Sequence, residues 1–145
     1  MAEVALTVAP AGDIVAVDLW TDTVPDFGAV RTVRVEPRRW WLIDGVDTDA
    51  VGESLRDDGA LIPIGGGLMR ATLTGPGWRA LLMVSGVFDA EECGFGPGSV
   101  AATVIHHVPV WIAPVAADCA EVYFAASYTK GLVDLWTAAI SRGLA

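Results

Sequence analysis

Paired histidines and paired carboxylates are the residues of this chain best suited to do chemistry. Imidazoles can ligate a metal, and of two neighbouring carboxyl groups one can act as a general acid and the other as a general base. The pairs are His106-His107, Asp57-Asp58 and Glu91-Glu92. Adjacent residues on a strand point to opposite faces, and neither an HExxH pattern nor a Cys/His cluster accompanies the histidines. We therefore predict a structural or surface role for the histidines and a solvated position for the carboxylates.

Two glycine-rich segments are candidates for anion binding or nucleophilic catalysis. Gly65-Gly66-Gly67 lacks the spacing of a dinucleotide or phosphate loop and precedes a predicted strand instead of a helix N-terminus. The segment 94–99, Gly-Phe-Gly-Pro-Gly-Ser, contains no Gly-x-Ser-x-Gly, and neither Ser85 nor Ser99 has a discernible Asp and His relay. We predict turns at both segments, with Ser99 bonding locally. We predict no catalytic, cofactor-binding or metal-binding residue in this chain.

The apolar content exceeds what one small core normally needs. Apolar residues make up 53% of the 145 residues, and six of them are tryptophans. The surplus favours association with a partner, and the alternative is one well-packed domain rich in Ala and Val. Trp40-Trp41 places two indoles on opposite faces of an extended segment, so we expect one to face away from the core as an interface anchor; a second packed layer is the alternative.

Charge and cysteine content indicate which kinds of partner are disfavoured and in which cellular compartment the protein is expected. The net charge of −9 argues against nucleic acid and against an anionic membrane surface. No apolar run reaches the ~20 residues of a membrane-spanning helix, and no signal peptide is recognisable. Cys93 and Cys119 fit neither a CxxC site nor a disulfide framework and are predicted to be reduced structural thiols. We expect a cytoplasmic protein.

The first 45 residues are predicted to be an extended N-terminal segment. They combine short β-branched stretches with turn-forming residues and show no helical period. Such a segment either adds strands to the domain's own sheet or reaches across a partner, and the sequence does not choose between these.

Residues 46–145 are predicted to form a single α+β domain, with a small, largely antiparallel sheet covered on one face by two helices. A short helix over Asp49–Asp57, capped by Asp47 or Thr48, comes first. The predicted order from Leu68 onward is β-α-β-β-β-α. The predicted strands are Leu68–Thr74, Val100–Ile105, Val108–Ile112 and Glu121–Ala125. The first helix follows Thr74-Gly75-Pro76 and runs from Trp78 to about Gly86. The last helix is capped by Ser127 and has an apolar stripe of Leu132, Leu135, Trp136 and Ala139. Pro109 indicates an edge position or a strand start.

Five sequence segments between Ala60 and Ala139 occur in an order typical of a known family. They are Leu61-Ile-Pro-Ile-Gly-Gly-Gly-Leu68, Leu73-Thr-Gly-Pro-Gly-Trp-Arg-Ala-Leu-Leu82, Phe95-Gly-Pro-Gly-Ser99 with Thr103, Val108-Pro-Val110, and Ser127-Tyr128 before a helix containing Leu135-Trp136. In this order they resemble the gamma subunit of heterotetrameric sarcosine oxidase. Ala126 departs from the family's Arg at that place, and Trp40-Trp41 does not align. The strand-Thr-Gly-helix unit is also similar to part of the folate-binding aminomethyltransferase fold.

The resemblance implies a non-catalytic small subunit of a multi-subunit flavoenzyme. In that family the larger alpha and beta subunits carry NAD, FAD, FMN and the folate site, and a small delta subunit binds zinc. The implied reaction is oxidative demethylation of an N-methyl amino acid or amine, with the one-carbon unit passed to tetrahydrofolate. The alternatives are a free-standing folate-binding or aminomethyltransferase-like protein, and an interaction module of an unrelated complex.

Overall fold

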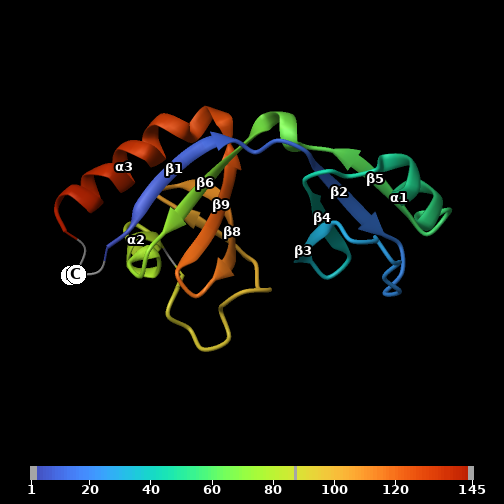
Figure 1. Ribbon diagram of the computed structural model, residues 1–145, viewed down its shortest axis with the longest axis horizontal. Coiled ribbons are helices and arrows are strands. Elements are labelled where there is room, and N and C mark those ends of the chain that lie inside the picture. The colour runs from blue at the N-terminus through green and yellow to red at the C-terminus, as the bar shows by residue number, and fades with distance from the viewer. Residues whose placement is uncertain (1–2, 87, 144–145) are drawn as a thin grey trace. The chain divides into compact units, whose positions relative to one another are not determined.

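The computed structural model describes residues 3–86 and 88–143, which form two compact units (Figure 1). The first, here called the five-stranded unit, contains the described residues up to Pro10 and from Leu68 onward. The second, the four-stranded unit, is Ala11–Gly67. Both sheets are antiparallel throughout, and the α+β class predicted from the sequence is confirmed. Within the described residues no helix is long and apolar enough to cross a membrane.

The five-stranded unit has the strand order β1-β6-β9-β8-β7. Its elements are β1 (Ala5–Pro10), β6 (Leu68–Thr74), α2 (Trp78–Met83), β7 (Ala101–Ile105), β8 (Val108–Ala116), β9 (Cys119–Ala125), a 3₁₀ turn η2 (Ala126–Tyr128) and α3 (Thr129–Ser141). From β6 onward this is the predicted order β-α-β-β-β-α. Pro109 is the second residue of β8, and β8 begins to pair with β9 only at Trp111, so the proline lies at a strand start.

Both helices of this unit pack on one face of its sheet. The inward residues alternate along each strand, as Ala71 and Leu73 do in β6, because successive side chains of a strand point to opposite faces. Trp78 of α2 and Trp136 of α3 join the same core and are fully buried, and the Trp136 ring meets Phe124 of β9 edge to face at 6.3 Å between centroids. The apolar stripe of the last helix therefore faces the core as predicted.

The start of α3 differs from the predicted Ser127 cap. Ser127 lies in the 3₁₀ turn η2, and Tyr128 occupies the N-cap position without a side-chain hydrogen bond. Instead, the Thr129 hydroxyl donates to the Ala126 carbonyl oxygen at 2.6 Å. The prediction was wrong because the chain makes one tight turn before it widens into the α-helix, which moves the cap and the first helical residue one position along.

The four-stranded unit has the strand order β3-β4-β2-β5. Its elements are β2 (Ile14–Leu19), β3 (Arg31–Glu36), β4 (Arg39–Ile43), α1 (Thr48–Leu55), β5 (Gly59–Pro63) and a 3₁₀ turn η1 (Gly65–Gly67). Asp47 caps α1 by accepting a hydrogen bond from the Ala50 N–H at 3.1 Å, as predicted. Val51 and Leu55 of α1 pack on β2 and β4 residues such as Val17 and Leu42.

The division of the chain differs from the expected boundary at residue 45. Residues before that point supply β1 to the five-stranded sheet and β2, β3 and β4 to the other sheet, so they add strands within the chain itself. The four-stranded unit closes only when β5 pairs with β2, from Val15↔Pro63 to Leu19↔Gly59. Such pairing between distant segments leaves no mark in local sequence pattern, which is why the expected boundary was misplaced.

Gly65 permits a close approach of two backbone segments in the four-stranded unit. A Cβ at this position would overlap the carbonyl oxygen of Gly12 and would lie 2.9 Å from the backbone nitrogen of Ile14. By contrast, a Cβ at Gly66 would meet nothing within 4 Å. The three glycines are thus a turn, as predicted, and only the first of them is sterically required.

Gly65→Ala should therefore destabilise the protein, whereas Gly66→Ala should not. We expect a loss of about 1–3 kcal/mol in the free energy of unfolding for Gly65→Ala, because backbone must move to admit the methyl group. For the matched Gly66→Ala we expect a change within about 1 kcal/mol. Urea denaturation of both variants measures this, and equal effects would contradict the close-approach argument.

The buried Trp136 gives a second stability prediction. Its indole Nε1 is buried without a hydrogen-bond partner among the described residues. Trp136→Ala should cost about 3–5 kcal/mol of unfolding free energy through lost packing and a cavity. Trp136→Phe should cost clearly less, because it keeps an aromatic ring in the core and removes the unpaired N–H. Denaturant midpoints at unchanged slope test this, and equal losses for the two variants would contradict it.

Candidate functional site

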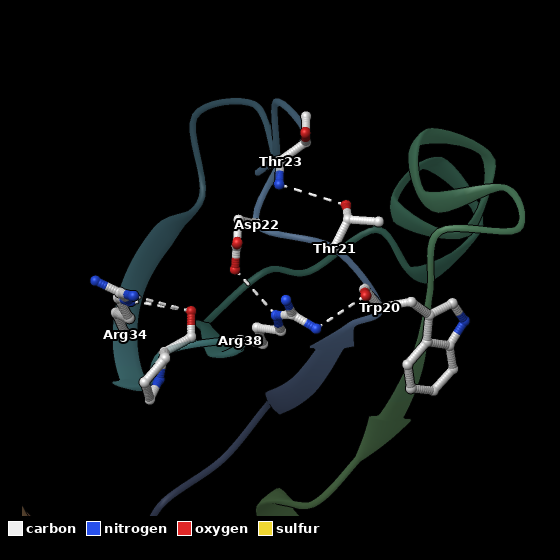
Figure 2. Close-up of polar contacts among 7 residues, drawn as sticks. Trp20, Thr21, Asp22, Thr23, Arg34 and Arg38 are labelled. Carbon is white, nitrogen blue, oxygen red and sulfur yellow. Dashed lines mark hydrogen bonds and ion pairs between the residues drawn. The ribbon is translucent and has the colours of Figure 1, made fainter.

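The loop after β2 holds an exposed tryptophan in a fixed position (Figure 2). The backbone N–H of Trp20 donates to the Asp58 carbonyl oxygen at 2.8 Å, and its carbonyl accepts from Arg38 Nη1 at 3.1 Å. Arg38 Nε also donates to Asp22 Oδ1 at 3.0 Å. The indole is 57% exposed, and Figure 2 shows it turned away from these polar contacts. The main chain of Trp20 is therefore held on both sides while its side chain meets solvent.

Two adjoining hollows lie beside α1 in the same unit. One, of about 570 Å³, is lined by residues that include Phe27, Val30, Asp44 and Asp47. The other, of about 600 Å³, is lined by Pro25, Glu53, Arg56 and Asp58 among others. Asp26, Ala50 and Ser54 line both hollows. Carboxylates thus dominate the polar lining of this surface.

Two of these carboxylates accept hydrogen bonds from nearby backbone N–H groups and so stabilise the local structure. Asp26 Oδ1 accepts from the Gly28 N–H at 2.8 Å, and Asp47 caps α1. Within the described part of the chain no group of three or more His, Cys, Asp or Glu side chains is placed to hold a metal ion. The hollows therefore offer a negative, partly apolar surface that favours cationic groups over anions.

Arg79 organises the glycine-rich loop in the five-stranded unit. Its guanidinium lies over the Trp78 ring, with 4.3 Å from Cζ to the ring centroid, and 5.8 Å from the Phe95 centroid. Arg79 Nη1 donates to the Ala90 carbonyl oxygen, and Phe88 meets Phe95 edge to face at 5.7 Å. This stack ties a helix residue to two points of the loop.

The rest of that loop is held by its own serine. Ser99 Oγ donates to the Gly94 carbonyl oxygen at 3.0 Å and accepts from the Gly96 N–H at 3.4 Å. The predicted local bonding of Ser99 is confirmed. Both Gly94 and Gly98 have positive φ, of 95° and 92°, which explains why glycines occur here.

A polar cluster on β6 and β9 has no signal in the sequence pattern. Tyr123 donates its hydroxyl hydrogen to Glu121 Oε1 at 2.8 Å, and Arg70 Cζ lies 5.4 Å from the Tyr123 ring centroid. Arg70 Nη1 is 3.8 Å from Glu121 Oε2, with side chains only 20% and 12% exposed. These residues lie on the sheet face opposite the helices, since their neighbours Ala71 and Val122 join the helix-facing core. Only the pairing of Arg70 with Tyr123 brings them together.

The histidine pair lies in a turn, which corrects the assumption of a strand. His106 and His107 form the two-residue connection between β7 and β8, and both have left-handed backbones with φ of 49° and 67°. Two positive values are typical of a type I′ hairpin turn, whose twist matches that of the flanking strands. Both side chains are exposed, with ring centroids 5.8 Å apart. The expected surface position is confirmed, although the rings do not lie on opposite faces of a strand.

The tandem tryptophans are both packed, contrary to the expected exposure of one indole. Trp41 is 4% exposed, and Trp40 lies against Phe27 with 6.3 Å between centroids. The alternative of a second packed layer fits Trp40, because it packs against the core of the four-stranded unit. The tryptophan that does face solvent is Trp20, which has no pattern of its own in the sequence.

The remaining candidates lie on the surface or in loops. Exposed positions are occupied by Asp57, Asp58, Glu91 and Glu92, as predicted. Cys93 is exposed and Cys119 half-buried, and both are free thiols.

The architecture defines a structural class of protein. It is an α+β chain in which a five-stranded antiparallel sheet carries two helices on one face, and a four-stranded unit is inserted after the first strand of that sheet. No family model matches the sequence, and no curated protein matches it.

A solved structure shares this fold. It is described as heterotetrameric sarcosine oxidase from Corynebacterium sp. U-96 in complex with pyrrole 2-carboxylate. The match has a TM-score of 0.80 at 16% sequence identity and covers 96% of this chain and 84% of the matched chain. The chain therefore has the fold of one chain of that enzyme over almost its whole length.

Removal of the Arg79 side chain should loosen the glycine-rich loop. Arg79→Ala removes the stack on Trp78 and the hydrogen bond to Ala90, so residues 88–99 should exchange amide hydrogens about tenfold faster or more. The core strands should be unchanged. Arg142→Ala, at the exposed end of α3, is the control. Hydrogen-exchange mass spectrometry measures the difference, and an unaffected loop would show that Arg79 does not order it.

Proposed function

We propose that this chain is the small, non-catalytic gamma-type subunit of a cytoplasmic multi-subunit flavoenzyme resembling heterotetrameric sarcosine oxidase. The single observation that carries the proposal is the fold shared with a chain of that enzyme. The aligned region covers 84% of the matched chain, so that chain is itself short, little longer than this one. A short chain fits a small subunit better than a large flavin-bearing one.

The order of the sequence segments supports the same proposal. The five resembling segments lie in β5 and η1, in β6 and α2, in the loop before β7, in β8, and in η2 and α3. The resemblance thus runs from Leu61 to Trp136, which covers most of the five-stranded unit and only the end of the four-stranded unit.

The electrostatics of the four-stranded unit support placing the cofactors in partner subunits. NAD, FAD and FMN carry phosphates, and folate carries a glutamate, whereas the hollows beside α1 are lined by Asp26, Asp47, Glu53 and Asp58. Carboxylates repel such anions at short range. We assign the flavins, NAD and tetrahydrofolate to the larger alpha and beta subunits and zinc to a small delta subunit. The complex would oxidise the N–CH₃ bond of an amino acid or amine and pass the one-carbon unit to tetrahydrofolate.

Purification of the assembly through this chain tests the proposal. An affinity-tagged full-length chain, expressed in its native host, should recover larger partners whose absorbance spectrum shows flavin. Anaerobic addition of sarcosine or another N-methyl amine should bleach that flavin. Native mass spectrometry gives the stoichiometry. Recovery of a colourless monomer would overturn the proposal.

Calorimetry with the isolated chain distinguishes the alternative of a free-standing folate-binding protein. Under the subunit proposal, titration with tetrahydrofolate should show no saturable heat. Saturable one-to-one binding would favour the alternative and contradict the placement of folate in a partner.

A further inference from the structure

We propose that one exposed surface of the four-stranded unit binds a larger partner subunit, at a place where the partner is basic and has an apolar pocket. This surface, here called the Trp20 surface, consists of Trp20, Val24, Pro25, Asp26, Glu53 and Asp58. The inference rests on the proposed function and adds to it the face through which the chain attaches. Trp20 inserts into an apolar pocket of the partner, and Lys or Arg side chains beside that pocket meet the carboxylates.

The exposed indole has the properties of a binding anchor. Its backbone N–H and carbonyl are held by Asp58 and Arg38, so little backbone freedom remains to be lost on binding. Tryptophan is enriched among residues that carry most of the energy of an interface. Val24, four residues further along the same loop, is 46% exposed and extends the apolar area.

The anchor is linked to the acidic hollow through Asp58 and through the loop to Pro25. Asp58 binds the Trp20 N–H through its carbonyl oxygen and also lines the larger hollow. Pro25, next to Val24, lines that hollow as well. The loop from Trp20 to Pro25 therefore leads directly from the indole to the carboxylates.

The net charge of the four-stranded unit indicates the charge that a partner surface should carry. Residues 11–67 contain eleven Asp and Glu and five Arg, so this unit holds −6 of the total −9. Arg38 is engaged by Asp22, and Arg39 by Asp18 and Glu36, with the Asp18 carboxylate raising the pKa of the Arg39 guanidinium. Arg56 is the single cation lining the larger hollow. The negative surplus at this surface favours a partner rich in Lys and Arg and opposes pairing of two copies of this chain.

Variants of the indole provide the first test. Tagged wild-type chain and Trp20→Ala are compared for recovery of the flavin-bearing partners, and affinity is measured by titration of the recovered partners. Trp20→Ala should weaken binding by roughly thirtyfold or more, and Trp20→Phe by less. The control is Tyr128→Ala, which removes an exposed aromatic ring, 42% exposed, from the five-stranded unit and should bind normally. Equal thermal unfolding of all variants excludes misfolding.

Charge variants provide the second test. Glu53→Gln with Asp58→Asn should weaken binding and reduce its sensitivity to salt, because fewer charges are screened. Glu92→Gln with Asp118→Asn removes the same charge from exposed positions of the five-stranded unit and should leave binding unchanged.

The outcomes separate the two proposals. If the wild-type chain recovers flavoprotein and Trp20→Ala recovers it equally well, the Trp20 surface is not the docking face, and the proposed function stands. If the wild-type chain recovers no flavoprotein, the proposed function and the partner named here both fall. A homodimer in sedimentation that Trp20→Ala dissociates would replace the partner subunit by a second copy.

Discussion

The antiparallel pairing of β1 with β6 is the constraint on which the rest of this chain depends. The register runs from Ala5↔Thr74 to Pro10↔Met69 without a bulge, so the chain leaves the five-stranded sheet at Pro10 and returns at the neighbouring strand at Leu68. Everything between forms its own sheet, β3-β4-β2-β5, closed by the pairing of β2 with β5. Because the entropy of closing a loop grows only with the logarithm of its length, so long an insertion is tolerated once the flanking strands pair.

Gly75 lies where the backbone before β1 approaches the end of β6 closely. Its N–H donates to the Asp118 carbonyl oxygen at 2.7 Å, and with φ of 123° a Cβ would lie 2.5 Å from the Glu3 carbonyl oxygen. The Gly77 N–H donates to the same Glu3 oxygen at 2.8 Å. The segment Thr-Gly-Pro-Gly-Trp, part of the family resemblance, therefore joins the start of β1 to the turn between β8 and β9 and delivers Trp78 to the core.

The two units of this chain differ in the features that they present. The five-stranded unit supplies a core containing two fully buried tryptophans and a loop ordered by the Arg79 stack. The four-stranded unit carries most of the negative charge, the hollows beside α1 and the exposed Trp20. The groups that we propose for recognition are thus concentrated in the four-stranded unit, and loops presented by a rigid scaffold commonly carry binding residues.

The sequence by itself determined the elements whose burial repeats locally: the strand at Leu68–Thr74, the helix capped by Asp47 and the apolar stripe of the last helix. Period and cap chemistry are properties of a few consecutive residues, so they can be read without the fold. Only the tertiary structure decided where β1 and β5 pair, that Arg70, Glu121 and Tyr123 meet, and that Trp20 instead of Trp40 faces solvent. Each of these depends on the register between strands far apart in the chain, which local pattern does not encode.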